Sequence, residues 1–271
     1  MLFRKQRFFQ AISTVLYNSY FYGFLIGTIY EGRLKLFPCP GFNCHSCPGA
    51  VFACPIGAIQ LFISFGVCHL SFYTLGFLGT VGTIGGRIVC GWSCPFGFIQ
   101  DMLYKIPSPK LEIPEFLQKG RYIVLFFLVI LVTYVTGDPW FCRLCPAGTL
   151  EAGFALLPQN KELVPLLGGL FAVKTAILII LVVFMVVSKR PFCRTLCPLG
   201  AVYSFFNRIS FLRLEVDKEK CMECDQCLIN CPVSIRVYEE GGNSTNCIRC
   251  FRCTDCPTGA VKVKWKTTLG V

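Results

Sequence analysis

Residues 193–202 read Cys193-Arg-Thr-Leu-Cys197-Pro-Leu-Gly-Ala-Val, shortly after one of the longest apolar segments of the chain. The pattern Cys-Pro-x-Gly-x-aliphatic within this stretch occurs four times, beginning at Cys54, Cys94, Cys145 and Cys197. A proline directly after the cysteine suits the first turn of a helix, where its missing N–H is not needed. The positive end of the helix dipole also favours an anionic sulfur. Each repeat therefore predicts a thiolate held at the start of a helix.

The segments beside these repeats are apolar enough to cross a membrane. The 271 residues are 54% hydrophobic and only 15% charged, whereas a soluble globular chain is about 25% charged. A membrane-spanning helix needs about 20 apolar residues, and four stretches qualify, at about 9–30, 58–84, 120–137 and 164–187. We therefore predict a mainly α fold, in which residues 1–210 form a four-transmembrane-helix bundle and residues 211–271 form a second, polar domain.

Basic residues predict the orientation of this bundle. They are concentrated at the amino terminus, in the loop between the second and third stretches, and after the fourth stretch. The side richer in Lys and Arg normally faces the cytoplasm, so we expect a multi-pass protein of the cytoplasmic (inner) membrane with both termini in the cytoplasm. The basic residues are dispersed along this face, which favours the lipid bilayer as a partner and argues against nucleic acid.

The cysteines of residues 211–271 give the strongest chemical signal. The chain has 19 Cys and only 2 His, and cysteines grouped at short intervals indicate metal or cluster ligation. The spacing Cys-x2-Cys-x2-Cys-x3-Cys-Pro, which begins at Cys221, is that of bacterial ferredoxins, in which the fourth Cys ligates the other [4Fe–4S] cluster. A second run begins at Cys247, with its last gap one residue shorter. Zinc also accepts four thiolates, but two such runs favour clusters.

Cross-ligation divides these eight cysteines into two sets. We predict a cytoplasmic, bacterial-type, two-cluster ferredoxin domain, hereafter the tail. The first tail set comprises Cys221, Cys224, Cys227 and Cys256, and the second tail set comprises Cys231, Cys247, Cys250 and Cys253.

Two further pairs of cysteines lie at the predicted inner surface of the membrane. Each pair has the spacing Cys-x3-Cys-Pro and cannot fill a four-thiolate site alone, but the two together can. Disulfides are the alternative, which a reducing cytoplasm disfavours. We therefore predict a third cluster on the inner set, which consists of Cys90, Cys94, Cys193 and Cys197.

Six cysteines lie in the two predicted outer loops, enough for one four-thiolate site but not for two. We expect an outer cluster held by four of the five residues Cys44, Cys47, Cys54, Cys142 and Cys145, with Cys39 as the spare thiol. Outside the cytoplasm disulfides are permitted, so paired cysteines remain the alternative in these loops.

Two ionisable side chains lie inside the predicted membrane stretches. Either His69 or Lys174 could serve a quinone site or a proton path. The alternatives are a hydrogen-bonded interhelical histidine and a lysine that extends outward to the membrane surface. Haem is not expected, because bis-histidine ligation needs paired imidazoles and the only candidates are His45, in a loop, and His69.

These motifs together resemble the NapH-like family, the membrane ferredoxins of periplasmic nitrate reductase systems, which are related to the polyferredoxin part of nitrous oxide reduction regulators. The matching strings are Cys90-Gly-Trp-Ser-Cys94-Pro, Cys193-Arg-Thr-Leu-Cys197-Pro and the eight tail cysteines. The resemblance implies an inner-membrane iron–sulfur protein of anaerobic respiration that passes electrons between a quinol pool or a cytoplasmic donor and an extracytoplasmic reductase. The outer cysteines depart from this family and look like a broader group of membrane ferredoxins in anaerobes.

We therefore expect an electron-transfer subunit of an oxidoreductase complex, with other redox subunits as partners and four [4Fe–4S] clusters. Sites at opposite membrane surfaces are separated by about 30 Å of hydrocarbon. Either the inner and outer clusters approach each other, or a quinone, or a flavin on a partner, fills the gap. Two alternative functions are a quinol dehydrogenase acting by itself and a redox-sensing or metal-reducing membrane ferredoxin.

Overall fold

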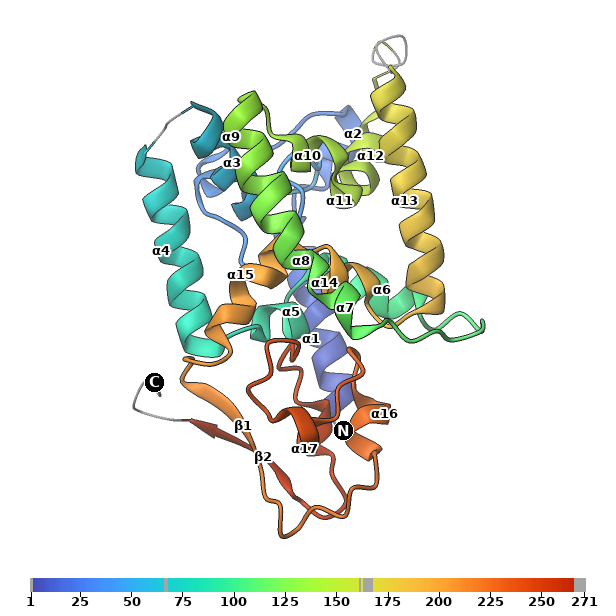
Figure 1. Ribbon diagram of the computed structural model, residues 1–271. Coiled ribbons are helices and arrows are strands. Elements are labelled where there is room, and N and C mark those ends of the chain that lie inside the picture. The colour runs from blue at the N-terminus through green and yellow to red at the C-terminus, as the bar shows by residue number, and fades with distance from the viewer. Residues whose placement is uncertain (1, 66–67, 161, 163–167, 266–271) are drawn as a thin grey trace.

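A computed structural model describes residues 2–65, 68–160, 162 and 168–265, and Figure 1 shows a mainly helical molecule with the tail at one end. The start of α1 lies at this same end, hereafter the tail end (Figure 1). The helices before residue 104 are α1 (Leu2–Tyr17), α2 (Tyr22–Ile26), η1 (Arg33–Leu36), α3 (Pro55–Phe65), α4 (Cys68–Gly85), α5 (Ile88–Trp92) and α6 (Pro95–Leu103).

The middle of the chain is also helical. Its elements are α7 (Glu115–Gln118), α8 (Gly120–Ile123), η2 (Val124–Leu131), α9 (Val132–Thr136), α10 (Trp140–Leu144), α11 (Pro146–Gly148), η3 (Thr149–Gly153), α12 (Phe154–Leu156), α13 (Gly169–Val187), α14 (Pro191–Thr195) and α15 (Pro198–Phe206). The tail contains β1 (Leu212–Val216), α16 (Gln226–Asn230), α17 (Val237–Glu240), η5 (Arg252–Thr254) and β2 (Val261–Trp265).

Within the described residues, two helical segments are long and apolar enough to cross a membrane. One is the segment Glu115–Thr136, which joins α7 to α9 through the π-helical η2, and the other is α13. At 1.5 Å per residue their 22 and 19 residues extend over about 33 Å and 28 Å, close to the thickness of the hydrocarbon core. These two segments correspond to the stretches predicted at 120–137 and 164–187, although residues 164–167 lie outside the described part.

The prediction of one helix over residues 9–30 was wrong, because α1 ends at Tyr17. The carbonyl of Tyr17 accepts a hydrogen bond from Val51 N (3.0 Å), so a loop segment replaces the next helical turn. Asn18 then donates from Nδ2 to the carbonyl of Thr14 (3.0 Å) and closes the helix end. The short helix α2 follows and ends at Gly27, whose φ of 69° favours glycine.

The stretch predicted as one helix at 58–84 is divided into α3 and α4, with residues 66–67 between them outside the described part. The apolar helix α3 begins at Pro55, directly after Cys54. The proline-after-cysteine signal therefore sets the start of α3 earlier than hydrophobicity alone indicated.

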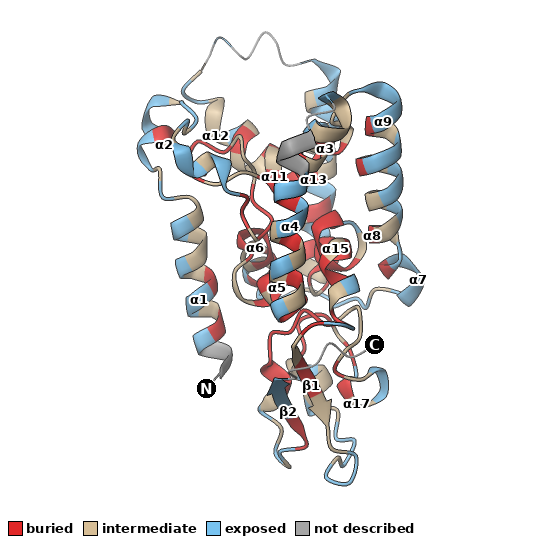
Figure 2. Ribbon diagram, turned by 90° about the vertical axis from the view of Figure 1, so that its left-hand side faces the viewer, coloured by how far each residue is buried: buried red, intermediate tan, exposed pale blue. Residues whose placement is uncertain are grey.

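The apolar surface lies on the outside of the helical region and the core lies at its centre. Figure 2 shows buried residues concentrated in α5, α6 and α15, and exposed residues on the outer faces of α1 and α9. Large exposed apolar side chains occur on four helical segments, with Phe9 on α1, Phe72 on α4, Phe126 in η2 and Ile180 on α13. An apolar exterior around a packed centre is typical of a protein that contacts lipid.

The tail packs directly on the helical region. Strands β1 and β2 pair antiparallel, with Leu212 opposite Trp265 and Val216 opposite Val261. Gly91, just after α5 residue Cys90, allows the closest approach: a Cβ there would lie 2.6 Å from the carbonyl oxygen of Ile248 and 3.1 Å from Cα of Cys250. A glycine at residue 91 therefore brings the backbone of the inner set against that of the second tail set.

Candidate cluster-binding sites

The predicted helix start at each Cys-Pro repeat is confirmed. Helices α6 and α15 begin with Pro95 and Pro198, and the cysteine before each proline is the N-cap. Gly97 N donates to Sγ of Cys94 (3.4 Å) and Gly200 N donates to Sγ of Cys197 (3.3 Å). In the other two repeats, α3 and α11 likewise begin at the proline. Backbone N–H groups at a helix start thus point at the sulfur, an arrangement that suits a thiolate.

The structure brings the four cysteines of the inner set together. They line one enclosed cavity, and their side chains interact electrostatically with one another. Burial raises the pKa of the Cys94 thiol to about 12, with Cys193 and Cys90 adding to the shift. A thiolate here therefore needs a bound positive centre to stabilise it. Among the described residues, no group of three or more His, Cys, Asp or Glu side chains is placed closely enough to hold a single metal ion.

Two buried arginines connect the two Cys-x3-Cys-Pro motifs of the inner set. Arg87 and Arg190 each stand three residues before the first cysteine of their own motif. Arg87 Nη2 donates to the carbonyl of Cys193 (3.2 Å), and Arg190 Nη1 donates to the carbonyl of Cys90 (2.7 Å). Each arginine therefore holds the opposite motif, and the repeat is better described as Arg-x2-Cys-x3-Cys-Pro-x-Gly.

Both arginines also face the second tail set. Arg190 interacts electrostatically with Cys193 and Cys250, and Arg87 with Cys193 and Cys247. Arg87 Nη1 donates to the carbonyl of Thr245 in the tail (2.9 Å). The two guanidinium groups therefore lie between thiols of two different sets, where they offset the negative charge that thiolates carry.

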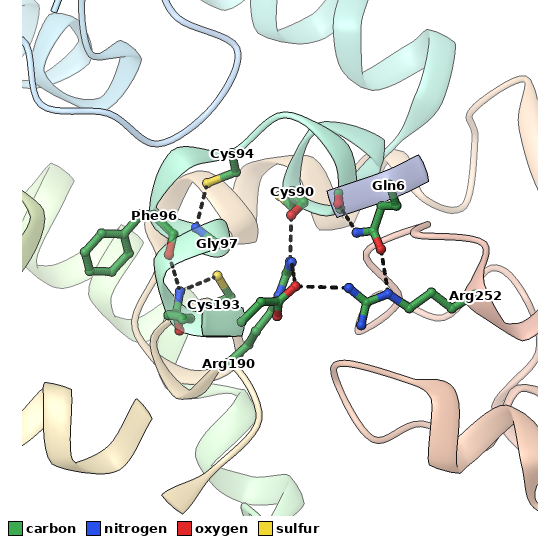
Figure 3. Close-up of polar contacts among 11 residues, drawn as sticks. Gln6, Cys90, Cys94, Phe96, Gly97, Arg190, Cys193 and Arg252 are labelled. Atoms are coloured by element: carbon green, nitrogen blue, oxygen red, sulfur yellow. Dashed lines mark hydrogen bonds and ion pairs between the residues drawn. The ribbon is translucent and has the colours of Figure 1, made fainter. Parts of the chain in front are cut away.

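A polar network joins this region to α1 and to the tail (Figure 3). Arg190 forms two hydrogen bonds of 2.7 Å with the carboxylate of Asp101, which also accepts one from Arg252 Nη2 (3.1 Å). Arg252 Nε donates to Oε1 of Gln6 (2.5 Å), and Gln6 Nε2 donates to the carbonyl of Gly91. Burial opposes ionisation of Asp101, but Arg190 and Arg252 outweigh it and lower the pKa of the carboxyl.

One side-chain amide also contacts a thiol of the inner set. Gln100 Nε2 donates to Sγ of Cys193 (3.0 Å) and to the carbonyl of Phe96 (3.3 Å). The inner set therefore has three N–H donors on sulfur, two buried cations and an enclosed cavity. This donor set fits a [4Fe–4S] cluster, whose potential depends on hydrogen bonds to sulfur and on burial.

The second tail set also comes together. All four of its cysteines are buried, and those of the second run interact electrostatically with Cys231. Arg249 N donates to Sγ of Cys247 (3.4 Å), and burial raises the pKa of that thiol to about 11. In the first tail set Cys224 is exposed and the other three cysteines are partly buried. The grouping of Cys256 with Cys221, Cys224 and Cys227 stays a prediction.

The structure distinguishes among the outer cysteines. Cys44, Cys54, Cys142 and Cys145 interact electrostatically with one another and line one cavity of about 390 Å³. Cys47 interacts with Cys44, Glu151 and Lys35 and does not line this cavity. We therefore name Cys44, Cys54, Cys142 and Cys145 the outer set. Cys39 is fully buried and interacts electrostatically with Cys94 and Cys54.

A carboxylate forms a hydrogen bond with a cysteine of the outer set. Glu151, in η3, accepts a hydrogen bond from Cys44 N (2.8 Å), and burial raises the pKa of its carboxyl to about 7 despite that bond. Sequence reasoning missed Glu151, as it missed Gln100, Asp101 and the two arginines. For the arginines the repeat itself held a signal, because both stand at the same offset from the cysteines.

An aromatic group separates the inner and outer cavities. Phe42 lines both of them. Its ring centroid lies 5.3 Å from that of Phe192, 5.9 Å from that of Phe96 and 6.2 Å from that of Phe141. The carbonyl oxygen of Phe42 lies 4.0 Å from Sγ of Cys94. The two cavities are therefore divided by a single layer of side chains and not by the full thickness of a bilayer.

Of the two ionisable side chains predicted in the membrane stretches, the structure describes only that of Lys174. Lys174 lines the cavity of the outer set, with Nζ 4.9 Å from the ring centroid of Phe171. Its role in a quinone or proton site stays a prediction. The side chain of His69 lies outside the described residues.

Comparison with known proteins places the chain in a family. A protein-family model described as a 4Fe-4S binding domain matches residues 69–114, 121–165 and 172–215. An uncharacterized protein of Methanocaldococcus jannaschii is 31% identical over 213 residues, which cover 74% of this chain and 81% of that protein. No solved structure matches the chain significantly.

Two relatives carry functional names. The ferredoxin-type protein NapH of Haemophilus influenzae is 26% identical over 64% of this chain and 60% of its own length. The Escherichia coli protein YccM, whose name assigns it to electron transport, is 26% identical over 64% of this chain and 50% of its own length. The chain thus spans about half to three fifths of these two relatives. It belongs to the NapH-like polyferredoxin family and binds several [4Fe–4S] clusters.

Proposed function

We propose that this protein is a membrane-integral electron-transfer subunit that carries electrons between a cytoplasmic or quinol donor and an extracytoplasmic or membrane partner. When bound, [4Fe–4S] clusters supply one-electron redox chemistry. The observation that carries the proposal is the order of the thiol sets: the second tail set packs on the inner set through Gly91, and the inner set is separated from the outer set by Phe42.

The chain's own residues perform three tasks in this arrangement. The cysteines would hold four clusters, on the first tail set, the second tail set, the inner set and the outer set. Arg87 and Arg190 fix the spacing between the inner set and the second tail set and offset negative charge there. Phe42 and its aromatic neighbours exclude water between the inner and outer cavities. Short separations matter because tunnelling falls steeply with distance.

The placement in the membrane belongs to the same proposal. The apolar outer faces of α1, α4, η2 and α13 support insertion as a multi-pass domain of residues 1–210. The start of α1 and the tail share one end of the molecule, and the excess of basic residues predicted there supports a cytoplasmic location for both termini.

Iron and acid-labile sulfide per chain, measured on anaerobically purified full-length protein, test the number of sites. Four clusters correspond to about sixteen irons. Cys193→Ser should lower the value by about four, whereas Cys39→Ser should leave it unchanged because Cys39 belongs to no set. A wild-type value near eight irons per chain would contradict clusters on both the inner and the outer set, because the two tail clusters alone account for about eight irons.

A quinol dehydrogenase is the second candidate, and the cavity of the outer set favours it. Beyond the thiols this cavity is lined by apolar side chains such as Leu156 and Phe171, and Arg143 and Lys174 add two cations. These residues fit an apolar ring with a polar edge. Reoxidation of the reduced protein by a menaquinone analogue, and its loss in Lys174→Met, would support this function over electron transfer alone.

A further inference from the structure

A strongly basic cavity lies at the tail end, between the helical region and the tail. Its volume is about 280 Å³, and we name it the junction cavity. Five cations line it, with Asp101 as the one carboxylate among its described lining residues, so it carries an excess of four positive charges. The five cations are Arg7, Lys105, Lys189, Arg190 and Arg252.

The single carboxylate does not compensate this charge. Both oxygens of Asp101 accept hydrogen bonds from Arg190, and one of them also accepts from Arg252. These three side chains are at least nine-tenths buried, with exposed fractions of 8%, 1% and 5% respectively. The floor of the cavity is therefore a built, preorganised cationic surface and not a set of mobile surface lysines.

The thiol sets account for only part of the charge. Arg190 and Arg252 face Cys250, and Lys189 faces Cys231 and Glu112. Arg7, which lies in α1, instead interacts electrostatically with Asp101 and Arg190. Arg7 and Lys105 add to this charge, and both also line a neighbouring cavity, among whose described lining residues there is no cysteine.

An apolar groove continues from the junction cavity. A neighbouring cavity of about 260 Å³ shares Arg7, Asp101 and Lys105 with it and adds Phe8, Phe98 and Met102. Phe8 and Met102 are 64% and 52% exposed. The charged cavity is also close to the end of the membrane-length helix α13, because Lys189 follows Val187 by two residues.

Buried arginines beside lysines are the usual groups that bind phosphate, and a basic pocket at the cytoplasmic end of membrane helices suits an anionic headgroup. We propose that the junction cavity binds the phosphate group of an anionic membrane lipid, whose acyl chain lies along Phe8 and Met102. The bound lipid would link α1, α6 and the tail beside Cys231. This inference rests on the membrane placement proposed above.

The experiment uses the full-length protein with its clusters, in detergent, titrated with phosphatidylglycerol, phosphatidylcholine or inorganic phosphate and followed by native mass spectrometry. We expect phosphatidylglycerol to be retained at least tenfold more tightly than phosphatidylcholine, and millimolar inorganic phosphate to compete with it. If inorganic phosphate binds tightly and phosphatidylglycerol is not retained, the lipid assignment is overturned and the cavity is a site for a soluble phosphate.

Matched variants locate the site. Lys105→Gln combined with Lys189→Gln should weaken phosphatidylglycerol binding at least tenfold. The corresponding double change to Arg keeps both charges and should retain binding. Lys119→Gln should have no effect, since Lys119 lies at the tail end outside the cavity. Equal binding of the two lipids, or equal losses in the Lys105/Lys189 and Lys119 variants, would overturn the inference. Iron content of each preparation reports folding. Failure of the wild-type protein to insert into liposomes would contradict the proposed membrane function instead.

Discussion

The inner and outer sets start from the same Cys-Pro-x-Gly helix start but have opposite surroundings. The inner set is enclosed, with Arg87 and Arg190 bonded to cysteine carbonyls and Gln100 bonded to a sulfur. The outer set borders a wider cavity that Arg143 and Lys174 also line, and the carboxylate of Glu151 accepts a hydrogen bond from Cys44 N. Cations stabilise the more negative, reduced state of a cluster and carboxylates destabilise it. Because the groups bonded directly to the cysteine backbone are cations at the inner set and a carboxylate at the outer set, we expect a higher reduction potential at the inner set.

The largest expected effect concerns which outer thiols are ligands. Cys142→Ser should remove about four irons per chain and one set of electron paramagnetic resonance signals, because Cys142 lines the outer cavity. Cys47→Ser is the matched control and should retain both, because Cys47 lies outside that cavity. Iron loss in Cys47→Ser but not in Cys142→Ser would reverse the assignment of the outer set.

The next effect tests the buried ion pairs that Asp101 forms beside the inner set. Asp101→Asn should destabilise the contact between the tail and the helical region by about 3 kcal/mol or more, because it leaves Arg190 and Arg252 buried without their counter-charge. Hydrogen exchange of tail amides measures this loss. Asp138→Asn breaks an ion pair with Arg143 whose side chains are both about two-fifths exposed, and it should change little.

The same carboxylate predicts a pH dependence of this contact. Because the pKa of Asp101 is lower in the folded protein than in the unfolded chain, its contribution to stability is present above the unfolded pKa. It is lost as the pH falls through the folded pKa. Tail amides of Asp101→Asn should therefore show a weaker response to acid than those of the wild-type protein.

A smaller effect concerns the reduction potential of the inner cluster. Arg87→Gln removes a buried cation that interacts with Cys193, so the midpoint potential should fall by some tens of millivolts. Arg87→Lys keeps the charge and should leave the potential closer to that of the wild-type protein. Redox titration followed by electron paramagnetic resonance measures both variants, and a rise in the Arg87→Gln potential would contradict the electrostatic argument.

The smallest effect is expected at the outer set. Glu151→Gln removes a carboxyl beside Cys44 but keeps the acceptor for Cys44 N, so the potential of the outer cluster should rise. The change should be smaller than that in Arg87→Gln, because the raised pKa of about 7 leaves Glu151 only partly ionised near neutral pH. If the reduction potential of the inner cluster shifted as much as that of the outer cluster in Glu151→Gln, the contrast between the two sites would be lost.

Local structure was largely predictable, and long-range placement was not. The starts of α3, α6, α11 and α15 follow from a proline after a cysteine, which four residues are enough to specify. The helix predicted over residues 9–30 was wrong because Val51, more than thirty residues downstream, takes the carbonyl of Tyr17. Hydrophobicity alone carries no information about such a competing partner.

The sequence by itself determined the chemistry of this protein: cysteine spacing and helix-start prolines are local, so they indicate iron–sulfur ligation and preformed thiolate sites without any knowledge of packing. Only the tertiary structure decided which outer thiols share a cavity, that Arg87 and Arg190 hold each other's motif, and that Phe42 alone lines both cavities among the described residues. These contacts join segments a hundred or more residues apart, and their geometry depends on how whole helices pack.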